Sequence, residues 1–355
     1  MPSPAPHTYL KTRAALLAKQ LFSPERLQQL LESSLDTLYQ EFGMESLAVL
    51  PGAESAINRA VERALMHTLM QELGVLLRPL AGEGRDILMH WARKFELYNL
   101  KALIRGKLQG HSFADVEQNL FDLPALISLP HDQLLRTENV LELLRQLEQG
   151  HYADIARQAR QVYEEKNESF SLDAAIDRSY YLGLLRRIRR IGEADRSALH
   201  SLVGTLIDQQ NLGWLLRYRF NYGLAPSETY YLLVPFGHHL HRDRLLDLVN
   251  LETFPQVIEA LPGRLSEPLA GVGDLLDLEW RLERITAAQA HHDVRFSASA
   301  VTRSLAYLVL REMDLKHLYA ILQGKVLGFT EQTIRSALGG TPVKAELRDN
   351  GAVDV

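Results

Sequence analysis

Apolar residues recur every three or four positions along almost the whole chain, a spacing that places them on one face of a helix. Near the start, Leu27, Leu30 and Leu31 follow Ser23, a candidate N-cap, and Pro24, which suits the first turn. Further helices are predicted at about 54–77, 83–109, 132–149, 152–167, 172–191, 194–221, 241–249, 272–291 and 298–327. The apolar stretch 230–236 contains Pro235 and reads as a helix end and turn. The pattern predicts an all-α protein.

An internal repeat organises these helices. Each copy has an acid, a polar residue three positions later, a Leu next and a base near the end, and the copies align without gaps over 96–107, 208–219 and 314–325. The separation of Asn99 and His317 equals that of Arg26 and Arg244, so two distant landmarks keep one register. Each copy is followed by punctuation that stops one helix and starts another, namely Gly110 and Ser112, Gly223 and Ser227, and Gly328 and Thr330.

The repeat predicts three helical domains of similar size. The boundaries fall at about 116 and 228, which gives repeat units 1–116, 117–228 and 229–338. The tail 339–355 is small and polar with little periodicity, and the first seven residues are rich in Pro. Both ends are therefore expected to be mobile.

Composition narrows the classes of function. Leu greatly outnumbers Val and Ile, which favours helices over strands, and the net charge is −5. The absence of Cys excludes disulfides, cysteine-bound zinc, iron–sulfur clusters and thiol nucleophiles. Long apolar segments are interrupted, as 73–80 is by Arg78 and Pro79, and the first residues lack the pattern of a secretory signal. A cytoplasmic location is expected.

Motifs for catalysis and for cofactors are missing from the sequence. Gly106-Lys107 and Gly324-Lys325 lie in predicted helices without the loop of a phosphate-binding motif, and Gly271-Val-Gly273 lacks a preceding strand. The best metal ligands are His238, His239 and His241, with His291 and His292, but no carboxylate completes a set at defined spacing. These histidines are therefore predicted to lie in a polar loop and at a solvated helix end. No catalytic residue, cofactor or metal is predicted.

The densest basic cluster is a candidate docking site. It consists of Arg186, Arg187, Arg189 and Arg190. These guanidinium groups can bind phosphates or the carboxylates of a protein partner, or they can form a solvated face paired with Glu193 and Asp195. Nucleic-acid binding is disfavoured because the second repeat unit is net acidic and lacks an aromatic platform with flanking bases.

Bases also recur at the three equivalent helix ends, as Arg105, Lys107, Arg217, Arg219 and Lys325. They can simply complement the helix dipoles. If the three units surround a pseudo-threefold axis, the same bases form a ring, which suits a coaxial protein partner.

These features resemble a known family, the C subunit of archaeal and bacterial A/V-type rotary ATPases, which is similar to the d subunit of eukaryotic vacuolar ATPases. The resemblance covers nearly the whole chain and is carried by segments 9–13, 99–103, 172–181 and 317–325. The chain departs from the family at His317, where Asn is more frequent, and at Gln323, where Arg is usual.

The resemblance implies a funnel of three similar helical domains around a pseudo-threefold axis. It implies a rotor adaptor without an active site or cofactor, a socket that joins the central stalk to the membrane proteolipid ring on the cytoplasmic face. Torque would pass through it between ATP synthesis or hydrolysis and the transport of protons or sodium ions. Contact with the membrane would be indirect, through the ring.

Two other classes of function stay open. A helical scaffold could bind a soluble protein partner, although solenoid repeats usually have about 33–47 residues and stack open-endedly. An all-helical enzyme is the third possibility, and it would require turnover that substitution of His239 or Arg187 abolishes.

Overall fold

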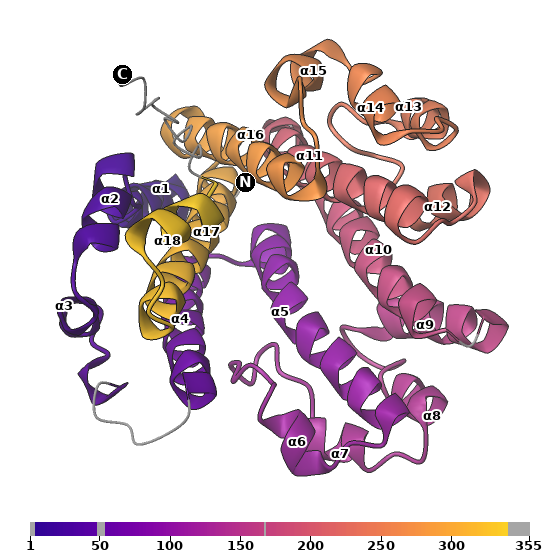
Figure 1. Cartoon of the computed structure of the whole chain (residues 1–355), viewed down its shortest axis with the longest axis horizontal. Helices are drawn as coiled ribbons and strands as arrows, with labels where there is room; N and C mark the ends of the chain where they lie inside the picture. The colour runs from indigo at the N-terminus through magenta and orange to yellow at the C-terminus, as the bar shows by residue number, and fades with distance from the viewer. Residues whose placement is uncertain (1–3, 48–53, 167, 340–355) are drawn as a thin grey trace, which may run out of the picture. The chain divides into compact units, whose positions relative to one another are not determined.

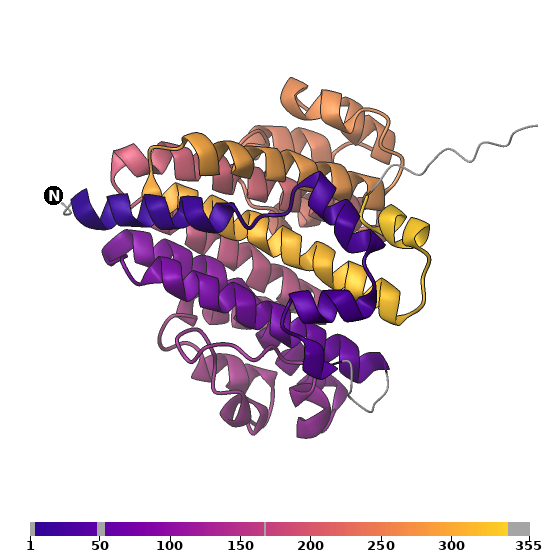
Figure 2. The same cartoon turned by 90° about the vertical axis from the view of Figure 1, so that its left-hand side faces the viewer.

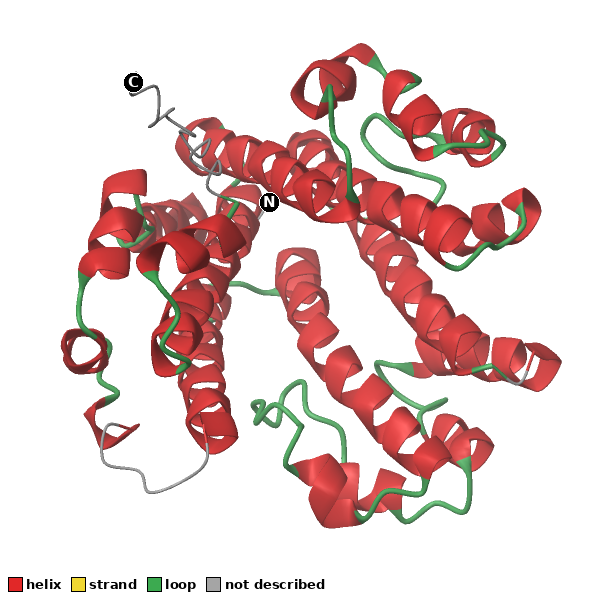
Figure 3. Cartoon of the chain, viewed as in Figure 1, coloured by secondary structure: helices red, strands yellow, loops and turns green. Residues whose placement is uncertain are grey.

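The computed structural model describes residues 4–47, 54–166 and 168–339, and these form an all-α fold (Figures 1 and 3). The first half contains α1 (Pro4–Ala18), α2 (Pro24–Glu32), α3 (Leu35–Glu41), η1 (Glu45–Leu47), α4 (Glu54–Leu77), α5 (Gly82–Gln109), α6 (Phe113–Glu117), α7 (His131–Leu135), α8 (Val140–Gln146) and α9 (Ala153–Lys166). The second half contains α10 (Ser169–Ile188), α11 (Glu193–Leu216), η2 (Arg217–Asn221), α12 (Pro226–Leu232), α13 (Arg242–Val249), α14 (Phe254–Glu259), α15 (Gly263–Leu269), α16 (Leu275–Phe296), α17 (Ala300–Val326) and α18 (Glu331–Ala337). Within these ranges, β pairing is limited to one isolated bridge between Phe236 and His241.

Most of the predicted helices are confirmed, and the prediction of one helix over 132–149 is wrong. Two short helices, α7 and α8, stand there instead. The Thr137 hydroxyl donates to the Leu134 carbonyl at 2.7 Å, and the Asn139 side chain accepts from the Glu142 amide at 3.0 Å as the N-cap of α8. Short polar side chains that bond to nearby backbone end one helix and start the next.

The N-cap residues of the helices differ from the prediction at one place. Ser112 and Thr330 are N-caps as expected, but Ser227 lies inside α12, whose N-cap position is Ala225. At the N-terminus, α1 begins at Pro4, so residues 4–7 are helical where the Pro-rich sequence predicts a mobile end. Residues 340–355 of the predicted tail lie outside the described residues.

The first of two compact units comprises residues 1–21 and 65–312. Within it α10 packs against α5 and α9, and α11 packs against α16 (Figure 1). Helix α1 lies beside α16, as Figure 2 shows along their length. One apolar core joins α5, α8, α9 and α10, and it includes the fully buried Leu100, Leu103, Leu143, Leu172 and Ile176. Leu-rich faces meeting at helical spacing account for this core.

The second unit is built from two parts that are far apart in the sequence, residues 22–64 and 313–355. Helix α18 packs against α2. The Phe22 amide donates to Asp314 Oδ2 at 2.9 Å, and Lys325 Nζ donates to the Leu31 carbonyl at 2.7 Å. The two compact units therefore group the residues differently from the repeats in the sequence. The division into three repeat units stays a prediction.

The repeat is visible in local packing at two helix ends. A Cβ added to Gly106 would lie 2.3 Å from Val116 Cγ2, and one added to Gly324 would lie 2.6 Å from Ile334 Cγ1. Both glycines therefore let a short following helix, α6 or α18, approach a long one closely. The glycine-apolar pairs have the same sequence separation. In the middle repeat Tyr218 stands at this position, and the backbone there is the π-helical η2.

Across the described part of the chain, no helix has the length and apolar character needed to span a bilayer.

Candidate functional site

A buried asparagine holds the loop that follows the long helix in two of the repeats. Asn99 Nδ2 donates to the Phe121 carbonyl at 3.0 Å, and the Phe121 amide donates to Asn99 Oδ1 at 2.7 Å. Asn211 forms the same pair of bonds with Val234, at 2.7 and 2.8 Å. An amide side chain can donate and accept at once, so it satisfies both groups of one residue. In the third repeat His317 occupies the position.

In every repeat, an acid lies one turn before this position on the same helix. Its carboxylate binds a segment that is farther away in the sequence. Glu96 accepts from the Leu129 amide at 2.7 Å and lies 2.7 Å from His131 Nε2. Asp208 accepts from the His239 amide at 2.6 Å and from the Leu240 amide at 3.0 Å. Asp314 accepts from the Phe22 amide. These acids are therefore structural anchors.

Burial dominates the electrostatics of Asp208. Removal of its carboxylate from water raises its pKa to about 6, although the amides of residues 238–240 oppose the shift because they stabilise the charged form. The loop approaches closely at Gly237, where an added Cβ would lie 1.9 Å from Asp208 Oδ1.

Three of the predicted docking bases bind backbone carbonyls. Lys107 Nζ donates to the carbonyls of Leu135, at 3.1 Å, and Thr137. Arg219 Nε donates to the Val249 carbonyl at 2.8 Å, and Lys325 donates to Leu31. Leu135 and Val249 end α7 and α13, and Leu31 lies in the last turn of α2, so each base satisfies carbonyls that a helix end leaves open.

The neighbouring bases Arg105 and Arg217 are more exposed. Arg105 Nη1 lies 3.2 Å from Asp173 Oδ2, and Arg217 Nη2 lies 2.7 Å from Glu279 Oε1. Such partly exposed ion pairs contribute little to stability, about 0–1 kcal/mol. Both guanidinium groups keep exposed surface that a protein partner can reach.

In the structure, the four clustered arginines have different surroundings. Arg186 pairs with Asp154 on α9 at 2.9 Å, and Arg187 pairs with Asp86 on α5 at 2.9 Å. The predicted partners Glu193 and Asp195 are not the ones that these two arginines use. Arg189 lies over the Phe236 ring at 5.1 Å, and Arg190 is exposed. Arg189 and Arg190 are thus the members placed at a surface turn, between α10 and α11.

The histidines of the predicted polar loop do not form a metal centre. The rings of His238 and His239 lie 4.2 Å apart, and burial lowers the pKa of both. Among residues 4–47, 54–166 and 168–339, no group of three or more potential ligands is placed to hold a metal ion. The His238 amide donates to the Gly204 carbonyl at 3.2 Å, which fixes this loop on α11.

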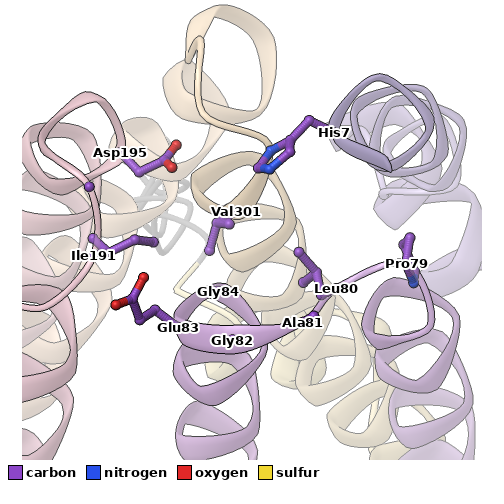
Figure 4. A pocket seen from close by; sticks show the side chains of 11 residues that line it. His7, Pro79, Leu80, Ala81, Gly82, Glu83, Gly84, Ile191, Asp195 and Val301 are labelled. Atoms are coloured by element: carbon purple, nitrogen blue, oxygen red, sulfur yellow. The ribbon is translucent and has the colours of Figure 1, made fainter. Parts of the chain in front are cut away.

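A pocket of about 570 Å³ lies in the first unit, beside the turn that carries Arg189 and Arg190 (Figure 4). Its lining comes from α1, the α4–α5 turn, the α10–α11 turn and the start of α17, and consists of His7, Pro79, Leu80, Ala81, Gly82, Glu83, Gly84, Ile191, Gly192, Asp195 and Val301. Figure 4 places the Glu83 and Asp195 carboxylates on the side of Ile191, and His7 on the side of Leu80. Apolar side chains with charged groups beside them suit contact with another polypeptide.

Sequence reasoning missed the pocket acids Glu83 and Asp195. Both lie in the first turn of a helix, where acids commonly complement the helix dipole, so their position along the sequence gives no signal of a shared pocket. The two turns and the residues of α1 and α17 that line the pocket are brought together only by packing of long helices.

Comparison with known proteins assigns the family. The sequence profile of the family described as ATP synthase (C/AC39) subunit matches residues 10–337. The C subunit of the A-type ATP synthase from Methanocaldococcus jannaschii is 26% identical over 94% of this chain and 86% of its own length. Its counterparts of the same name from Methanothermobacter thermautotrophicus and Halobacterium salinarum are 25% and 24% identical, over 94% of this chain and 88% and 98% of their own lengths. The chain therefore belongs to the ATP synthase (C/AC39) subunit family.

Proposed function

We propose that the chain is a non-catalytic rotor adaptor, a socket that joins the central stalk of a rotary ATPase to its membrane proteolipid ring. It transmits torque between ATP synthesis or hydrolysis in the soluble sector and proton or sodium transport in the ring. Its place is the cytoplasmic face of the membrane, which it reaches through the ring. The family match supports a rotary ATPase subunit, and the order of three capping contacts supports the socket.

One observation supports the proposed socket role. In each repeat a base caps a helix end that belongs to another repeat, and the three contacts follow a cyclic order. Lys107 binds the end of α7, near the start of the second predicted repeat unit, and Arg219 binds the end of α13, near the start of the third. Lys325 binds Leu31 in α2, near the start of the first. The last repeat therefore contacts the first as each earlier repeat contacts the next. An open-ended solenoid leaves its last repeat without such a partner, so the order of these contacts argues against a solenoid scaffold.

The docking surface that we propose for a stalk subunit is the pocket of Figure 4 with the adjoining Arg189 and Arg190. Ile191 and Gly192 line the pocket directly after these arginines. The apolar lining of this pocket and the charged side chains beside it resemble the core and the rim of protein interfaces. Arg105 and Arg217 are secondary candidates, because each already has an acidic neighbour.

The test is recovery of partners from membranes. The tagged chain is purified from detergent-solubilised membranes of its own cell, and its partners are identified by mass spectrometry. We expect central-stalk subunits and the proteolipid, and we expect no ATP hydrolysis by the isolated chain. Recovery of neither partner contradicts the proposal. Small-angle scattering of the isolated chain adds a second check, because an extended superhelix would favour a solenoid scaffold.

A further inference from the structure

A second pocket, of about 360 Å³, lies between α9 and α10 and is unusually basic. Its lining consists of Asp154, Arg157, Gln158, Arg178, Ser179, Leu182 and Arg186. The lining thus contains three arginines and one acid. Ser179, Leu182 and Arg186 follow one another at three- and four-residue spacing, which puts them along one stripe of α10.

The single carboxylate of the lining forms ion pairs with two of the three arginines and so competes with any other anion for them. Arg157 Nη2 lies 2.6 Å from Asp154 Oδ1, and Arg186 Nη2 lies 2.9 Å from Asp154 Oδ2. Each oxygen of Asp154 is therefore engaged by a different guanidinium group. Each of these arginines keeps further N–H donors that Asp154 does not use.

Arg178 is fixed by the backbone and not by an acid. Its Nε donates to the Leu233 carbonyl at 3.0 Å, and no ion pair joins it to a carboxylate of the described residues. Burial lowers the pKa of Arg178, because removal from water disfavours the charged form. An anion in the pocket would relieve this cost.

We propose that this pocket binds a phosphate group. The guanidinium fork matches the geometry of phosphate oxygens, and the Gln158 amide and the Ser179 hydroxyl are further donors in the lining. The excess of two positive charges over the carboxylate matches the charge of a phosphate dianion. Such binding does not depend on the rotor function. The group can come from free orthophosphate or from the headgroup of an anionic lipid.

Two probes distinguish the sources. Isothermal titration of the full chain with inorganic phosphate tests the free anion. Flotation with vesicles tests the headgroup, with phosphatidic acid, whose headgroup is a phosphomonoester, in phosphatidylcholine against phosphatidylcholine alone. We expect saturable binding of at least one probe. Absence of binding to both overturns the proposal.

Variants locate the site. Arg157→Gln and Arg186→Gln should each weaken binding about tenfold, because each removes one charge-assisted contact. The matched control is Arg160→Gln, since Arg160 lies on α9 but pairs with Glu148 and Glu164 outside the pocket. It should change binding less than about twofold. An equal loss in the control overturns the proposal.

Asp154→Asn supplies a change of opposite sign. It removes the only carboxylate of the lining and should tighten phosphate binding severalfold, a gain that misfolding cannot produce. A loss of binding in this variant, with circular dichroism unchanged, contradicts the site.

Discussion

Two buried titratable residues give the protein opposite responses to pH. His90 is 3% exposed and stacks on Tyr180, and its Nε2 lies 2.9 Å from the Tyr180 carbonyl. A carbonyl only accepts, so Nε2 carries the proton of a neutral ring. Burial first, and the positive charge of Arg187 next, lower its pKa to about 3. The folded protein therefore holds His90 neutral while the unfolded chain protonates it below about pH 6.5.

The first prediction concerns this histidine. Because the unfolded state binds the extra proton, stability falls as pH falls below about 6.5, by about 1.4 kcal/mol per pH unit. The loss continues until the folded pKa of about 3 is reached. His90→Gln should remove this part of the pH dependence, as measured by urea unfolding at about pH 7 and about pH 5. Substitution of the exposed His111 by Gln is the control. Equal pH dependence in all three proteins would contradict the assignment.

The second prediction concerns Asp208, where the sign is reversed. Its raised pKa of about 6 lets the folded state keep a proton that the unfolded chain releases near pH 4. This stabilising contribution is present below about pH 4 and is lost as pH rises through about 6. Asp208→Asn, although less stable overall, should gain about 2–3 kcal/mol relative to wild type between about pH 4 and pH 7. A constant difference between the two unfolding curves would show that Asp208 titrates normally.

At the scale of elements, Gly204 lets the loop at His238 lie directly against the backbone of α11. A Cβ on Gly204 would lie 2.9 Å from the backbone nitrogen of His238, whereas nothing lies within 4 Å of a Cβ on Gly213 of the same helix. Gly204→Ala should therefore lower the free energy of unfolding by about 1–3 kcal/mol, because backbone must shift. Gly213→Ala should raise it by about 0.5–1 kcal/mol through helix propensity. Equal changes in denaturant midpoint would refute this account of the packing.

A fourth prediction tests the contact between α17 and α2. Lys325→Met keeps the length of the side chain but leaves the Leu31 carbonyl without its donor. We expect a loss of about 1–2 kcal/mol and faster hydrogen exchange in α2. Gln323→Met, two residues earlier on α17, serves as the comparison. Unchanged exchange in α2 for both variants would count against this contact and against the cyclic order that it completes.

Elements were predictable where local sequence decides them. Apolar spacing located the long helices, and Ser23, Ser112 and Thr330 marked their starts because a cap acts within one turn. The break at Thr137 was missed, since an apolar pattern continues through it. The candidate site was predictable only in part. The capping role of Lys107 and the pocket acids depend on helix packing, which residue spacing does not encode.

At the scale of the whole molecule, the docking proposal makes a prediction about charge. Reversal of the exposed turn in the double variant Arg189→Glu, Arg190→Glu should reduce recovery of central-stalk subunits severalfold while leaving circular dichroism unchanged. The control is Arg244→Glu, at an exposed position on α13. Full recovery with the double variant returns these arginines to a solvated face and leaves the family assignment intact.

The composition of the second compact unit has a consequence for biosynthesis. Residues 22–64 leave the ribosome long before residues 313–339, with which they form this unit. Leu30 and Leu31, which are buried in the folded protein, therefore stay exposed on the nascent chain until residues 313–339 have been made. Closure of so long a segment also carries a loop entropy cost, so this unit should be the last to fold. Premature termination before residue 313 would leave an N-terminal segment open to chaperones and proteases.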